Sequence, residues 1–162
     1  MMDMESKSEK YARLKQEIDA VIEGEPTRTA RYATAACLLS QAFEDFFWTG
    51  FYLVDPNRKE QLVVGPYVGT LGCLRIDFAR GVCGAAARTG QTIIVDNVHE
   101  FEGHIACDSA TNSEIVVPIF DASGELMAVL DVDSTKFSTF DTADKAGLEA
   151  ICATLLAGAQ HP

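Results

Sequence analysis

The sequence predicts a single α+β domain in which a central, mainly antiparallel β-sheet is flanked by helices. Two helical patterns open the chain, short strand patterns interrupted by one short helix fill its middle, and a further helical pattern closes it. Elements in this order are typical of a sheet covered by helices. With 162 residues, 48% of them hydrophobic, the chain is long enough to bury one substantial core.

Two amphipathic helices are predicted before the first strand. The first covers residues 10–24 and the second residues 27–46, where Thr27 is placed to cap the helix and Cys37 falls on its apolar face. Apolar residues of the first helix recur at the spacing of one helical face. They are Tyr11, Leu14, Ile18, Val21 and Ile22.

The middle of the chain changes to the shorter period of β-strands. Aromatic and β-branched residues in 48–55 and 61–69 flank a polar cluster, which predicts a hairpin. Residues 73–81 indicate a further strand or loop. A short helix closed by its final glycine is predicted at 81–90, and a short strand at 91–98.

A polar loop leads to two more strands and a final helix. The strands lie within residues 113–124 and 125–136 and are joined by the turn Asp-Ala-Ser-Gly. The helix begins near Asp141 or Thr142, and Cys152 lies on its apolar face.

The predicted organisation has three parts. Residues 1–26 form an N-terminal helix and link, residues 27–158 form the main domain, and residues 159–162 form a frayed tail.

Charge and hydropathy exclude two classes of partner and indicate a compartment. The formal net charge of −11 argues against nucleic acid and anionic lipid, which recruit stripes of lysine and arginine. The chain contains neither a run of about 18 apolar residues nor an N-terminal apolar segment typical of a signal peptide. We therefore expect a cytoplasmic protein that does not bind membranes.

Five cysteines form a poor disulfide framework for a cytosolic chain, so each is considered separately. Cys37 and Cys152 stand among alanine and leucine, where a free cysteine behaves as a small buried hydrophobe. Cys73, Cys83 and Cys107 lie in glycine-rich or polar settings, where backbone amides can approach a thiolate and lower its pKa. Taken singly each can be inert, whereas together they indicate reactive thiols. Their spacings of 9 and 23 intervening residues do not match paired zinc ligands.

Three acidic residues and one tryptophan have both a structural and a functional interpretation. Asp131 and Asp133 share one face of a strand while Val132 points to the other. The two carboxylates either face solvent at a strand end or flank a pocket, where they hold an ammonium group or retain a proton. Glu114 is either an exposed strand start or a third member of that pocket. Trp48 is either core or a flat apolar wall for a small ligand.

The chain resembles the free methionine-(R)-sulfoxide reductase family, an enzyme branch of the GAF-domain superfamily, over roughly residues 30–157. The resemblance lies in the phrases WTGFYLVD, LVVGPYVGTLGC, GVCGAAARTGQTIIVDNV, GHIACDSATNSEIVVPI and LDVDS. It is specific because generic GAF sensor domains lack the three cysteines found here in GCLRI, GVCG and HIACDS. One departure is Glu102, which stands where the family commonly has proline and is expected to loosen that loop.

The resemblance implies a GAF-like fold and thiol-dependent reduction of free L-methionine-(R)-sulfoxide. Cys107 is then the attacking thiol, which becomes a sulfenic acid, and either Cys73 or Cys83 condenses with it to form a disulfide. A thioredoxin-like partner reduces the disulfide. The family resemblance also implies a homodimer packed through the N-terminal helices, and the chemistry needs neither a cofactor nor a metal.

The same resemblance suggests roles for the pocket residues. Glu114 and Asp133 are expected near the sulfoxide oxygen and Asp131 toward the amino group, while Trp48 and Tyr52 form an aromatic wall for the methyl group. Two other functions remain open: a non-catalytic GAF sensor of a small ligand, and a thiol peroxidase or redox sensor.

Overall fold

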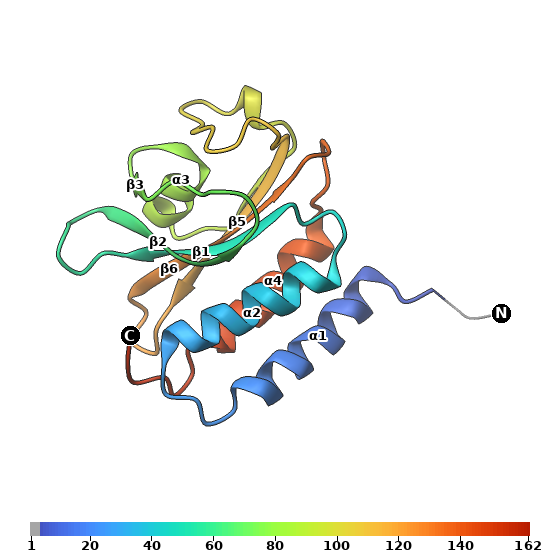
Figure 1. Ribbon diagram of the computed structural model, residues 1–162, viewed down its shortest axis with the longest axis vertical. Helices are drawn as coiled ribbons and strands as arrows, with labels where there is room; N and C mark the ends of the chain where they lie inside the picture. The colour runs from blue at the N-terminus through green and yellow to red at the C-terminus, as the bar shows by residue number, and fades with distance from the viewer. Residues whose placement is uncertain (1–3) are drawn as a thin grey trace.

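A six-stranded antiparallel sheet forms the centre of the computed structural model, which describes residues 4–162 (Figure 1). The strand order is β3-β2-β1-β6-β5-β4, and every neighbouring pair is antiparallel. The strands are β1 Trp48–Val54, β2 Gln61–Val68, β3 Arg75–Asp77, β4 Ile93–Val95, β5 Ser113–Phe120 and β6 Leu126–Ser134.

Helices cover both faces of this sheet (Figure 1). Helices α1 (Lys7–Ile22), α2 (Arg28–Ala42) and α4 (Thr142–Leu155) pack together on one face, and α3 (Gly81–Thr89) lies on the other. A 3-10 turn, η1 (Val98–Glu100), lies in the connection between β4 and β5. The predicted α+β architecture is confirmed. No helix within residues 4–162 is long and apolar enough to cross a membrane.

Alternation along the strands divides the apolar core into two clusters, one on each face of the sheet. Phe51, Leu130 and Val132 pack against α1, α2 and α4 on the helix face. On the opposite face, Val116 and Val129 pack with residues of α3. We call this second side the cavity face, because the cavity described below opens on it.

The second helix departs from its prediction in three respects. It ends at Ala42, Thr27 occupies its N-cap position without a capping hydrogen bond from its side chain, and Cys37 is exposed. The buried face passes through Ala35, Ala36 and Leu39. Alanines occur all around this helix, so composition alone does not identify the face that is buried.

Other local predictions agree better with the structure. The left-handed Gly90 closes α3 as predicted, and Asp141 caps α4 in a capping box with Asp144. Strand β4 is only three residues long, shorter than its apolar run indicated. Cys152 is buried, as predicted.

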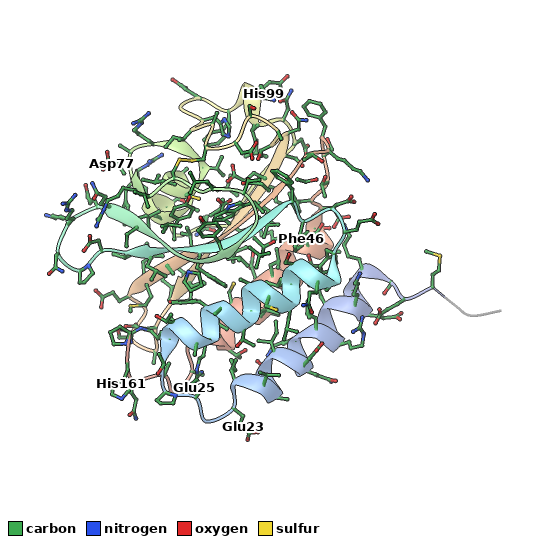
Figure 2. The ribbon with its side chains drawn as sticks, in the orientation of Figure 1. Glu23, Glu25, Phe46, Asp77, His99 and His161 are labelled. Carbon is green, nitrogen blue, oxygen red and sulfur yellow. A yellow bond between two sulfur atoms is a disulfide. The ribbon has the colours of Figure 1, made fainter. Side chains whose placement is uncertain are left out.

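The last residues of the chain are held rather than frayed. The amides of Gln160 and His161 both donate to the carbonyl of Pro26, and the Arg28 amide donates to the carbonyl of His161. Figure 2 shows His161 beside Glu25 at the start of α2. These hydrogen bonds satisfy backbone groups of the link before α2. The polar sequence of the tail contains no local pattern that predicts this long-range pairing.

Candidate active site

The register of three strands aligns the predicted pocket residues in rows on the cavity face. Asp133 of β6 pairs with Trp48 of β1 on one side and with Glu114 of β5 on the other. One row further along β6, Asp131 pairs with Gly50. Directly paired residues project to the same face of a sheet. The sequence prediction that Asp131 and Asp133 share a face is confirmed.

Small residues make room for an aromatic wall beside these rows. The Trp48 ring stacks on Tyr67 and on Tyr52, with centroid distances of 4.9 and 5.8 Å. A Cβ at Gly50 would lie 2.2 Å from the Cβ of Tyr67, so a larger residue there would displace the stack. The Trp48 indole Nε1 donates to the Thr70 carbonyl at 2.8 Å, which anchors the ring to the loop after β2.

Seven of the eight predicted site residues line one small cavity on this face. Its volume is about 40 Å³, enough for about three water molecules. Cys73 is the exception, although it is bonded to a lining residue. The seven are Trp48, Tyr52, Cys83, Cys107, Glu114, Asp131 and Asp133.

A disulfide joins Cys73 to Cys107 at the mouth of this cavity. Their Cα atoms are 5.5 Å apart, within the usual range for a disulfide. Beside it, the Thr70 hydroxyl donates to Asp108 at 2.6 Å and ties together the same two loops. Sequence analysis did not identify this polar pair, because two residues on separate loops carry no local pattern.

Cys83 has a different environment from the other two cysteines. It lies on α3, is buried, and places its Sγ within 4.8 Å of ligand atoms of Glu114 and Asp131. Burial raises the pKa of the Cys83 thiol, and the nearby Asp131 and Glu114 charges raise it further. The expectation that its pKa is lowered is therefore wrong. Helix α3 packs it into the apolar cluster instead of exposing it to free amides.

Three carboxyl groups of the cavity, those of Glu114, Asp131 and Asp133, lie together in surroundings that favour their protonated forms. Burial raises the pKa of Glu114 well above its usual range, and the adjacent Asp131 and Asp133 charges add to this shift. Burial also raises the pKa of Asp133 strongly. The pKa of Asp131 rises for the same reason, but neighbouring Glu114 and Cys83 oppose the rise by donating toward it. Asp131 is therefore the member that best retains a negative charge.

One oxygen of Asp131 and the neighbouring helix terminus remain available to a ligand. Asp131 Oδ1 is buried without a hydrogen-bond partner. The first turn of α3, from Gly81 to Cys83, also lines the cavity, and the N-cap Arg80 provides no side-chain cap there. Amides at a helix N-terminus favour an anion. The cavity thus presents one acceptor and one weakly positive edge.

A metal site is poorly supported by the same residues. Within residues 4–162, the group that could supply three ligand atoms is Cys83, Glu114 and Asp131. It contains no imidazole, and its thiol and Glu114 favour their protonated forms, whereas zinc sites use deprotonated cysteine with histidine or further cysteines. A zinc site built from Cys73, Cys83 and Cys107 is also disfavoured, because Cys73 and Cys107 are bonded to each other in the disulfide.

Comparison with known proteins agrees with the geometry. The GAF domain family matches residues 26–157. The free methionine-R-sulfoxide reductase of Escherichia coli is 41% identical over 150 residues, covering 93% of this chain and 88% of that protein. The Saccharomyces cerevisiae protein of the same name is 37% identical, covering 82% of this chain and 76% of that protein.

A solved structure extends this similarity to three dimensions. The free methionine-R-sulfoxide reductase of Neisseria meningitidis, in complex with its substrate, is 40% identical with a TM-score of 0.88. The alignment covers 96% of this chain and 91% of that one. With its GAF fold and this extent of identity, the chain belongs to the free methionine-R-sulfoxide reductase family of GAF-domain proteins.

Proposed function

We propose that this protein reduces free L-methionine-(R)-sulfoxide to L-methionine, with Cys107 as the nucleophile. The observation that carries the proposal is the position of Cys107 at the mouth of a cavity in which the pKa values of Glu114 and Asp133 are raised well above their usual range. A sulfoxide is attacked at sulfur only when its oxygen receives a proton. Nucleophile and acid are therefore brought to one small space.

The chemistry divides into two steps. The Cys107 thiolate attacks the sulfoxide sulfur while Glu114 or Asp133 protonates the oxygen, which gives an adduct with a new bond between the two sulfur atoms. That bond then breaks as the hydroxyl passes to Cys107 Sγ, so that methionine leaves and Cys107 becomes a sulfenic acid. A second thiol then attacks the Cys107 sulfur, forms a disulfide and expels water. Together the two steps transfer two electrons from two thiols to the sulfoxide.

Cys73 is the resolving thiol in this proposal. Its bond to Cys107 in the structure supports the assignment, since it shows that the fold accommodates this disulfide with an ordinary Cα separation of 5.5 Å. Cys83 is the weaker candidate because burial keeps its thiol protonated. The Cys83 Sγ lies within 4.8 Å of carboxylate oxygens of Asp131 and Glu114. Its thiol instead donates toward Asp131, which favours the charged form of that carboxylate.

Substrate recognition follows from the unpaired groups of the cavity. Asp131 Oδ1, which lacks a partner, would accept a hydrogen bond from the substrate ammonium, and the first turn of α3 would face its carboxylate. The stacked rings of Trp48 and Tyr52 would contact the methyl group. A methionine sulfoxide within a peptide has neither terminal charge and would leave Asp131 buried and unpaired.

The disulfide form has too little room for an amino acid, which supports an order in which the disulfide opens before the substrate enters. A cavity of about 40 Å³ accommodates only a few water molecules. Substrate entry would therefore follow opening of the Cys73–Cys107 bond. A dithiol reductant of the thioredoxin type would perform that opening, which suits a cytosolic protein.

A homodimer remains a separate proposal from the family resemblance. The groove between α1 and α4 is lined by small apolar residues, including Ala12, Ala146 and Ala150. Such a surface would allow close approach of a second copy. Sedimentation velocity would test it, with a monomeric mass as the contrary result.

The function is tested by following NADPH oxidation with thioredoxin, thioredoxin reductase and free L-methionine-(R)-sulfoxide. We expect turnover with this epimer and little with the S epimer, a peptide sulfoxide or hydrogen peroxide. Cys107→Ser should abolish turnover, whereas Cys37→Ser, which changes an exposed thiol, should not. A sensor would consume no NADPH, and a peroxidase would prefer peroxide. Full activity of Cys107→Ser would refute the proposal.

A further inference from the structure

Two leucines on either side of Cys73 are among the most exposed apolar side chains described. Leu71 is 80% exposed and Leu74 is 71% exposed. A single exposed leucine needs no explanation. Here two of them flank a half-buried cysteine whose disulfide partner, Cys107, is itself exposed. The loop of residues 69–74 thus combines apolar surface with an accessible disulfide.

Hydrogen bonds on the inner side of this loop hold it to the rest of the domain. The Thr70 carbonyl accepts from Trp48 Nε1 at 2.8 Å, and the Thr70 hydroxyl donates to Asp108 at 2.6 Å. The Leu74 carbonyl accepts from the amide of Val64 in β2 at 2.9 Å. These contacts fix both ends of the segment that carries Leu71, Cys73 and Leu74.

A glycine brings the centre of the loop close to the aromatic wall. A Cβ at Gly72 would lie 2.9 Å from the Trp48 ring and 3.2 Å from the Tyr52 hydroxyl. The backbone beside Cys73 therefore rests directly on the rings. A surface held in this way loses little conformational entropy when a partner binds it.

We propose that residues 69–74 are the docking surface for the protein dithiol that reduces the Cys73–Cys107 bond. This inference rests on the proposed function, in which the disulfide must be reopened in every cycle. The partner is a small protein whose reactive dithiol is surrounded by apolar surface, which Leu71 and Leu74 would cover. Apolar contact does not depend on opposite charges. This matters here because the protein has a formal net charge of −11 and would not attract an acidic partner electrostatically.

In this proposal the attacked sulfur is that of Cys73, the cysteine flanked by the two exposed leucines. The reductant thiolate bonds to Cys73 Sγ, the Cys73–Cys107 bond breaks, and Cys107 leaves with the electron pair and takes up a proton. The second reductant thiol then attacks its own partner sulfur, which releases Cys73 as a thiol and the reductant as a disulfide. Since Cys107 lines the cavity and Cys73 does not, this direction returns the nucleophile to the cavity at once.

The docking surface is tested by the rate at which reduced thioredoxin reduces the oxidised protein without any sulfoxide present. Leu74 does not line the cavity, so Leu74→Ser alters the surface alone. We expect this variant to be reduced about tenfold more slowly by thioredoxin. A tenfold change corresponds to roughly half or all of the free energy gained by burying one leucine side chain. Reduction by dithiothreitol should change less than about twofold, because a small dithiol needs no docking surface.

Val21→Ser is the matched control, since Val21 is 60% exposed but lies on α1, on the other side of the sheet (Figure 1). It should leave both rates unchanged. An unchanged thioredoxin rate in Leu74→Ser would overturn the docking surface, as would an equal loss with both reductants. Failure of the proposed function would appear separately, as absence of methionine formation with dithiothreitol in the unaltered protein.

The attacked sulfur is tested by trapping. Thioredoxin that lacks its second reactive cysteine should remain covalently attached to the protein, and peptide mapping should find the linkage at Cys73. A linkage at Cys107 would contradict the assignment.

Discussion

Each face of the sheet has acidic side chains in its interior and one buried free cysteine, a single carboxylate on the helix face and a group of three on the cavity face, but the two faces provide these acids with different partners. On the helix face, Asp144 accepts hydrogen bonds from the Tyr11 hydroxyl at 2.7 Å, from Lys7 Nζ at 2.8 Å and from the Asp141 amide at 2.9 Å. Every partner is a donor, and one carries a positive charge. This carboxylate joins α1 to the start of α4 and is structural.

On the cavity face, three carboxyl groups lie together with far fewer donors. Neither lysine nor arginine occurs among the described residues that line the cavity. Burial and neighbouring negative charges raise the pKa values of Glu114 and Asp133, and one oxygen of Asp131 has no hydrogen-bond partner. A buried carboxylate that is surrounded by hydrogen-bond donors stabilises the fold. A buried carboxyl group that lacks such donors has a raised pKa and can act as a proton donor.

The largest expected effect is on catalysis at the cavity face. Glu114→Gln keeps the shape of the side chain but removes the acidic proton, so we expect kcat/KM for the sulfoxide to fall by roughly 100-fold or more. Stability at neutral pH should not fall, because the amide carries no charge to bury. Steady-state kinetics and urea unfolding of the same preparation measure both. A variant that keeps full activity would remove Glu114 from the mechanism.

The pH dependence of stability provides a second measure of the same group. Below the unfolded pKa of about 4.5 both states hold the Glu114 proton. As pH rises above it, the unfolded chain releases this proton while the folded protein retains it, so stability falls until the raised folded pKa is passed. We expect Glu114→Gln to gain more than about 1 kcal/mol over the unaltered protein between pH 5 and 8. Parallel curves would contradict the raised pKa.

The same acid-to-amide change on the helix face should have the opposite result. Asp144→Asn removes the charge that pairs with Lys7 and turns one acceptor toward the Asp141 amide into a donor. Lys7 is partly exposed, so we expect a loss of about 2–3 kcal/mol in the free energy of unfolding, below that of a fully buried pair. Sulfoxide turnover should remain within about twofold. Loss of activity without loss of stability would break the distinction between the two faces.

The two buried cysteines provide the smallest contrast. Cys152 is surrounded by hydrocarbon in the helix-face core, so Cys152→Ser should cost about 1–2 kcal/mol of stability and leave turnover unchanged. Cys83→Ser places a hydroxyl beside Asp131, which can accept its hydrogen bond. This substitution should therefore lower the free energy of unfolding by less than Cys152→Ser. Thioredoxin-linked turnover should fall less than about tenfold if Cys73 resolves the sulfenic acid. Complete loss would transfer the resolving role to Cys83.

Much of the fold was predictable because its signals are local. The caps of α4, the left-handed glycine after α3 and the alternation in β6 each involve residues within a few positions of one another. Errors arose where the local signal was weak. Cys37 stands in an alanine-rich helix whose buried face composition does not mark, and the tail pairs with a link more than 130 residues away.

The sequence by itself determined that Asp131 and Asp133 share a face, since strand alternation is a property of the backbone. The family resemblance pointed to the same acids and to three cysteines. Only the tertiary structure decided that the shared face is buried, that Cys73 meets Cys107, and that Cys83 lies sealed beside Asp131. Distance, burial and the resulting pKa depend on segments remote in the chain, and no local spacing encodes them.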